Sequence, residues 1–169
     1  MLAATFARRT GAQVDKYLGW LGPLLLRLTI GVIFIGTGWG KLHDLPKVVA
    51  FFTDLHIPLP EFQARLVATL EFVGGSCILL GLATRCFAAP LAFTMIIAML
   101  TAKTAELAEV HGFDRFTTVV GFEEWSYFAM LVLLAVTGPG LLSLDRLILR
   151  TLARPPATVK EAVDSGKGN

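Results

Sequence analysis

The stretch LLLRLTIGVIFIGTGWGKL, residues 24–42, decides the fold. It is almost entirely apolar residues and glycine, which predicts a membrane-crossing helix, because about 20 apolar residues at about 1.5 Å each span a bilayer. Two charged residues interrupt it, Arg27 and Lys41. Charge in hydrocarbon is costly, and intramembrane charges usually face the interior of a helix bundle or a wet cavity. We therefore expect one face of this helix to point toward protein rather than lipid.

The composition of the whole chain also indicates a membrane protein. Its 169 residues are 54% hydrophobic and only 17% charged, and the mean hydropathy is +0.66. A soluble domain has roughly a quarter of its residues charged, so the surplus apolar surface must contact a lipid bilayer. The formal net charge of +2 is too small to suggest a nucleic-acid partner.

The apolar runs predict an all-α fold, an integral membrane four-helix bundle. The spans are expected at about residues 20–41, 62–83, 86–104 and 122–138. They form a membrane domain over residues 20–150, which follows a cytoplasmic N-terminal segment at 1–19. The polar segment 151–169 contains proline and glycine, which predicts a disordered cytoplasmic tail.

Basic residues are distributed unevenly between the two sides of this bundle. An even number of spans places both termini on one side, which collects nine basic residues, against five on the other. The positive-inside bias then places both termini in the cytoplasm. The nine are Arg8, Arg9, Lys16, Arg85, Arg146, Arg150, Arg154, Lys160 and Lys167, and the five are Lys41, Lys47, Arg65, Lys103 and Arg115.

The two outer connections are more than simple loops. Residues 44–62 predict a short amphipathic helix lying on or dipping into the outer membrane face, stopped by Pro58 and Pro60. Its apolar residues are Val48, Val49, Phe51, Phe52 and Leu55, and its polar ones are Lys47, Thr53 and Asp54. Residues 104–116 are a second candidate for such a helix. Each half of the chain then reads as span, amphipathic segment, span, which suggests an internal duplication.

Charged residues in or beside the spans are predicted to cluster. At about 1.5 Å per residue, Glu71, Lys103 and Glu124 share one depth, about 21–24 Å above the cytoplasmic ends of their spans. Helical stripes align these charges with residues suited to packing. The stripes are Arg27, Gly31, Phe34, Gly38 and Lys41; Glu71, Gly74, Gly75 and Ile78; and Glu124, Phe128, Leu131 and Ala135.

This arrangement predicts a polar cluster with Arg27 as its floor and Lys41 as its roof. One interpretation is a set of ion pairs that holds four helices together. The other is a polar pocket for a ligand or a proton. The sequence leaves both interpretations open.

Other chemistry-bearing residues carry weaker signals. The three histidines, His43, His56 and His111, all fall in the outer connections, so no span offers an axial histidine to a haem, and no spacing supports a metal site. Cys77 and Cys86 form no CxxC motif, so the chain has no dithiol redox motif of its own. We therefore predict neither haem nor metal.

Four motifs in order make the chain resemble the DoxX family of small bacterial inner-membrane proteins. They are RLTIGVIFIGTGWGKL (27–42), FFTDLHIPLP (51–60), LEFVGGSCILLGLATR (70–85) and GPGLLSLD (138–145). The resemblance implies a four-helix bundle in the bacterial inner membrane. It also implies kinship with a subunit of a thiosulfate:quinone oxidoreductase and with proteins of redox complexes. Related proteins that use a dithiol carry CxxC, which this sequence lacks.

The leading hypothesis is a quinone-interacting subunit or accessory of an oxidoreductase complex, with ubiquinone or menaquinone as the ligand. Glu71 and Glu124 would act as proton acceptors. Arg27, Lys41 and Lys103 would donate hydrogen bonds, and the walls would come from Phe34, Trp39, Phe72 and Trp125. Because no redox centre is encoded, electrons would come from other subunits.

Two alternatives remain. In one, the protein is a non-catalytic membrane anchor or assembly partner whose charges are structural. In the other, it is a small transporter or lipid-binding protein, which would need to form a homo-oligomer to build a path across the membrane.

Overall fold

The protein consists of helices joined by turns and short loops, with no strand, over residues 20–140 and 143–152, the part of the chain that the computed structural model describes. The helices are α2 (Leu21–His43), α3 (Leu45–Asp54), α4 (Pro60–Leu80), α5 (Thr84–Ala102), α6 (Thr104–Ala108), α7 (Phe113–Gly121), α8 (Glu123–Thr137) and α9 (Leu144–Leu152). This confirms the predicted all-α membrane fold. The predicted segment 1–19 and residues 153–169 of the predicted tail lie outside the described residues.

Three helices, α2, α4 and α5, are each long and apolar enough to cross a membrane. The fourth candidate span is the pair α7 and α8, which is bent by 71°. The long helices and α8 begin and end within three residues of the predicted spans. Large apolar side chains such as Val32, Val73 and Phe93 are exposed on their outer faces, as expected for helices that contact lipid. Which side of the membrane the termini occupy stays a prediction.

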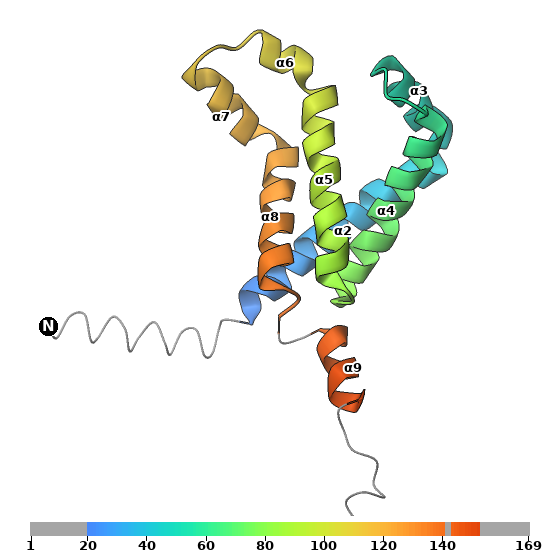
Figure 1. Cartoon of the computed structure of the whole chain (residues 1–169), viewed down its shortest axis with the longest axis vertical. Helices are drawn as coiled ribbons and strands as arrows, with labels where there is room; N and C mark the ends of the chain where they lie inside the picture. The colour runs from blue at the N-terminus through green and yellow to red at the C-terminus, as the bar shows by residue number, and fades with distance from the viewer. Residues whose placement is uncertain (1–19, 141–142, 153–169) are drawn as a thin grey trace, which may run out of the picture.

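The long helices pack as two pairs, α2 with α4 and α5 with α8. The two pairs lie close together beside the α4–α5 turn, and α2 and α4 lean away from α5 toward α3 (Figure 1). We call the region beside the α4–α5 turn the turn end, and the region near α3, where the two pairs are further apart, the α3 end. In each half of the chain the connection between the paired helices carries short helices, α3 in one and α6 and α7 in the other, which is the repeated order expected from the sequence.

Glycines set the close approach of α2 to α4. A Cβ atom at Gly31 would lie 2.7 Å from the Leu79 Cβ atom, and one at Gly75 would lie 2.8 Å from the Ile35 backbone nitrogen. At Gly38 an added Cβ would collide with the backbone nitrogen of Phe72. These positions confirm that the glycine stripes on both helices serve helix packing, as small residues commonly do in membranes.

Arg27 ties the turn end together. Its guanidinium donates hydrogen bonds to the carbonyl oxygens of Ile78 at 3.0 Å, Leu79 at 2.9 Å and Pro139 at 2.9 Å. The first two belong to the last turn of α4, whose carbonyls lack the usual partner four residues further on, and of these the Ile78 carbonyl also accepts the Gly81 N–H at 3.0 Å. With Arg27 only 3% exposed, water cannot easily replace this donor. The arginine therefore joins α2 to the end of α4 and to the loop after α8.

Neighbouring contacts at the turn end work in the same way. Gly81 ends α4 with a φ of +71°, and a Cβ there would lie 2.5 Å from the Arg27 Cζ atom, so the arginine needs glycine at this position. The Asp145 carboxylate accepts the Ala83 N–H at 2.9 and 3.0 Å, and the Asp145 N–H donates to the Gly81 carbonyl at 3.2 Å. The start of α9 is thereby fixed to the α4–α5 turn.

These contacts correct one expectation from the sequence. Arg27 is not the floor of a cluster with Glu71 and Glu124. It lies beside Ile78, seven residues or about 10 Å along α4 from Glu71, and its guanidinium donates to the backbone carbonyls of Ile78, Leu79 and Pro139. A helical stripe gives the direction in which a side chain points, but it does not reveal backbone acceptors at the end of a neighbouring helix.

Replacing Gly38 by alanine tests the α2–α4 contact. We expect Gly38→Ala to cost about 1–3 kcal/mol, the usual price of overpacking, and to lower the Tm of the detergent-solubilised protein by roughly 2–4 °C per kcal/mol. Gly36→Ala is the matched control, because a methyl group at Gly36 meets nothing within 4 Å and both variants gain the same helix propensity. Equal changes in Tm would contradict the contact.

Replacing Arg27 by methionine tests the role of its guanidinium. We expect Arg27→Met to destabilise the protein by several kcal/mol, because a hydrogen bond from a charged donor contributes about 1.5–3 kcal/mol and three carbonyls lose theirs. The stability of Arg27→Lys should lie between those of the wild type and Arg27→Met, since an ammonium lacks the planar fork of donors. The readouts are Tm and the monodisperse fraction in size-exclusion chromatography. Arg85→Met, which removes an exposed arginine at the same end, should change both far less, and a wild-type Tm for Arg27→Met would refute this role.

Candidate functional site

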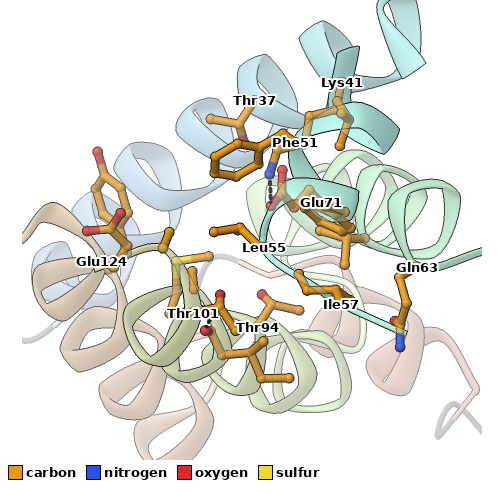
Figure 2. A pocket seen from close by; sticks show the side chains of 18 of the residues that line it. Thr37, Lys41, Phe51, Leu55, Ile57, Gln63, Glu71, Thr94, Thr101 and Glu124 are labelled. Carbon is orange, nitrogen blue, oxygen red and sulfur yellow. Dashed lines mark hydrogen bonds and ion pairs between the residues drawn. The ribbon is translucent and has the colours of Figure 1, made fainter. Parts of the chain in front are cut away.

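A cavity of about 490 Å³ lies among α2, α3, α4, α5 and α8 (Figure 2). It lies where the two helix pairs diverge, and α3 forms one of its walls. The walls are mostly apolar: Phe34 comes from α2, Phe51 and Leu55 from α3 and its end, and Met95 from α5. Small-molecule pockets usually measure about 300–1,000 Å³ and have mainly apolar walls with a few polar groups. The cavity has this size and character.

The first polar group of the cavity is the ion pair of Lys41 and Glu71. The Lys41 Nζ atom lies 2.5 Å from the Glu71 Oε1 atom. Both residues line the cavity (Figure 2). Lys41 comes from the last turn of α2 and Glu71 from the middle of α4. The predicted approach of Lys41 to Glu71 is confirmed.

The two partners of this pair differ in their access to water. The Glu71 residue is 1% exposed, and its Oε2 atom has no hydrogen-bond partner. The Lys41 side chain is 32% exposed. An ionised carboxylate oxygen buried without a donor is costly. The site therefore holds one unused hydrogen-bond acceptor.

The second polar group lies at the start of α8. Glu123, Glu124 and Tyr127 all line the cavity, and the Tyr127 hydroxyl donates to the Glu123 Oε2 atom at 3.2 Å. The two carboxylates occupy the first turn of α8, where the positive end of the helix dipole favours negative charge. The Tyr127 ring also packs edge-on against Phe34, with centroids 6.2 Å apart. Glu123, Glu124 and Tyr127, which we call the α8 group, thus border the same apolar wall.

Of the nine site residues predicted from the sequence, the structure brings four to the cavity and places five elsewhere. The four are Phe34, Lys41, Glu71 and Glu124. The five are Arg27, Trp39, Phe72, Lys103 and Trp125, none of which lines it. The binding or catalytic role of each of these residues stays a prediction.

The five residues outside the cavity have other contacts. Trp39 is 55% exposed and stacks on Phe72, with ring centroids 5.7 Å apart, on the outer face of the α2–α4 pair. Lys103 pairs with Glu106 at 3.0 Å. The Trp125 ring packs against Phe128 at 5.8 Å. An aromatic residue near a charged stripe is therefore a poor indicator of a cavity wall here.

Sequence reasoning missed several residues of the site. Tyr127 lies three and four positions after Glu124 and Glu123, and this helical spacing was the signal that could have found it. The apolar residues of α3 were expected to lie on the membrane face, yet Phe51, Phe52 and Leu55 line the cavity. Amphipathicity shows that a face is buried, but not whether lipid or protein covers it.

Within residues 20–140 and 143–152 no group of three or more His, Cys, Asp or Glu side chains could hold a metal ion. Cys77 and Cys86 are both free cysteines.

The chain is similar in sequence to a family of known proteins. The family model described as DoxX matches residues 22–104. The chain is 33% identical to the Bacillus subtilis (strain 168) protein named "Putative oxidoreductase CatD" over 77% of this chain and 89% of that protein.

Two Escherichia coli (strain K12) proteins match to a similar degree. Identity to the inner membrane protein YqjF is 32%, over 79% of this chain and 96% of that protein. Identity to the inner membrane protein YphA is also 32%, over 73% of this chain and 87% of that protein. No solved structure matches the chain significantly. The family model and these relatives show that the chain belongs to the DoxX family.

Proposed function

We propose that this protein binds the head group of a membrane quinone or quinol, as a subunit or accessory of an inner-membrane oxidoreductase complex. The observation that carries this proposal is the cavity of about 490 Å³ with the Lys41–Glu71 ion pair on its otherwise apolar wall. The name of the Bacillus subtilis relative, which calls it an oxidoreductase, agrees with a redox role.

The chemistry of a quinone suits this cavity. The ring is flat and apolar on both faces, and its two oxygens stand at opposite edges. Phe34 and Met95 supply apolar surface for the ring. The Lys41 ammonium can donate a hydrogen bond to a quinone oxygen, and the α8 group of Glu123, Glu124 and Tyr127 can accept hydrogen bonds from the hydroxyl groups of a quinol. Quinones dissolve in the bilayer, so a cavity among membrane helices can be reached from lipid.

The proposal assigns electron transfer to a partner. The sequence contains no CxxC motif, and the cavity lining contains neither cysteine nor histidine. This chain would bind and orient the head group and exchange its protons through the carboxylates. A redox-active subunit or substrate of the same complex would exchange the electrons.

A second candidate is a non-catalytic anchor or assembly partner. The observation in its favour is Arg27, a buried intramembrane charge that bonds backbone carbonyls at the turn end. One charge of this chain therefore has a purely structural explanation. Glu71 differs from it, because its Oε2 atom is left without a partner.

Quinone content tests the proposal directly. We expect protein purified from bacterial membranes to carry ubiquinone or menaquinone, detected by solvent extraction and mass spectrometry. Ala98→Phe should lower this content by about tenfold or more, because Ala98 lines the cavity and a phenyl ring there would occupy the head-group space. Ala129→Phe is the matched control, since Ala129 is exposed on α8 outside the cavity.

The proposal fails if the wild-type protein carries no quinone and binds none that is added in nanodiscs. It also fails if Ala98→Phe and Ala129→Phe, both folded, retain the same quinone content as the wild type. In either case the anchor interpretation would be favoured.

A further inference from the structure

We propose that the cavity binds the reduced form of its ligand, a hydroquinone with two O–H donors, more tightly than the oxidised quinone. This inference rests on the proposed function and deepens it by naming the redox state that the site prefers. It follows from the hydrogen-bonding groups that face the cavity, because a quinone carries only acceptors whereas a hydroquinone carries two donors.

Glu71 is the first acceptor. Its Oε1 atom is occupied by the Lys41 ammonium at 2.5 Å, and its Oε2 atom has no partner. As the partner of an ammonium, the carboxylate offers acceptors only. The residue is 1% exposed and its free oxygen is buried in the wall, so water does not satisfy this oxygen. A turn of the carboxylate toward the cavity would bring it to a ligand hydroxyl. A quinone carbonyl at the same place would set two acceptors against each other.

Tyr127 provides the second acceptor. Its hydroxyl hydrogen is used toward the Glu123 Oε2 atom at 3.2 Å. The lone pairs of the Tyr127 oxygen therefore remain available to accept a hydrogen bond. The Glu124 carboxylate, which also lines the cavity, adds acceptors at this side (Figure 2). Both polar groups of the cavity thus present acceptors.

The hydroxyl groups of the cavity wall do not reverse this balance. The Thr37 hydroxyl donates to the Phe34 carbonyl at 3.3 Å, and the Thr94 hydroxyl donates to the Leu91 carbonyl at 2.7 Å. The Thr101 hydroxyl likewise donates to the Ile97 carbonyl at 2.8 Å, so all three threonines of the wall donate their hydroxyl hydrogen to a carbonyl of their own helix. Toward a ligand they offer lone pairs, which again suit a hydroxyl donor.

The remaining donors of the wall are Lys41, Lys47 and Gln63. All three are at least partly exposed, so water can hydrate their N–H groups when the cavity is empty. Gaining a ligand carbonyl there replaces one hydrogen bond by another. A ligand hydroxyl at Glu71 instead donates to a buried oxygen that has no hydrogen bond when the cavity is empty. This gain in free energy is the larger of the two. The balance favours the hydroquinone.

Affinity for the two redox forms tests this inference. We expect ubiquinol-1 to bind the full-length protein in nanodiscs at least about tenfold more tightly than ubiquinone-1, measured anaerobically by isothermal titration calorimetry. A tenfold preference corresponds to a midpoint potential of the bound couple about 30 mV above that of the free couple. A redox titration of the bound quinone provides an independent readout.

Two variants locate the preference. Glu71→Gln should bring the affinity ratio close to one, because an amide can turn its NH₂ group toward a quinone carbonyl. Tyr127→Phe removes the second acceptor and should lower the ratio severalfold. Ser126→Ala, which removes an exposed hydroxyl of α8 outside the cavity, should leave the ratio at the wild-type value.

The outcomes separate the two proposals. If both forms bind with equal affinity, or ubiquinone-1 binds more tightly, the redox preference is wrong and the quinone site stands. If neither form binds, both proposals are wrong. If the preference persists in Glu71→Gln or, should that variant not fold, in Tyr127→Phe, the assignment of these acceptors is overturned.

Discussion

The hydrogen bonds from Arg27 to the end of α4 and to the loop after α8 are the interaction on which the bundle depends. The last carbonyls of α4 that Arg27 contacts are shielded from water, because Arg27 is only 3% exposed, so they need a donor from within the protein. Arg27 supplies it from α2 and at the same time binds the Pro139 carbonyl. One side chain thereby fixes both helix pairs at the turn end, where Asp145 adds a second tie.

The cavity is the counterpart of this fixed end. Gly31, Gly38 and Gly75 allow α2 and α4 to pack closely against each other. The two helices therefore diverge together from α5 toward the α3 end (Figure 1). The space left between the pairs is lined by side chains of both pairs and of α3. Tight packing within the pairs and loose packing between them are therefore parts of one arrangement.

Sequence reasoning reached the helices and part of the site. The four apolar runs predicted the long helices because length and hydropathy decide membrane crossing, and the stripe from Gly31 to Lys41 correctly placed Lys41 toward Glu71. The role of Arg27 could not be found in this way, since its partners are backbone carbonyls that any residue carries. Trp39 and Phe72 do not line the cavity, because each follows a residue of a stripe directly, and successive side chains on a helix point about 100° apart.

Arg27 and Glu71 are the charged residues that are buried in the described part of the chain, and they show that a buried charge can have different roles. The guanidinium of Arg27 donates hydrogen bonds to three backbone carbonyls, so its charge stabilises the fold. Glu71 has one oxygen paired with Lys41 and one without a partner. In a low-dielectric cavity an unmet acceptor carries a larger penalty than it would in water. A ligand that donates a hydrogen bond recovers this penalty, which is why the incomplete satisfaction of Glu71, rather than the presence of charge in a span, points to binding.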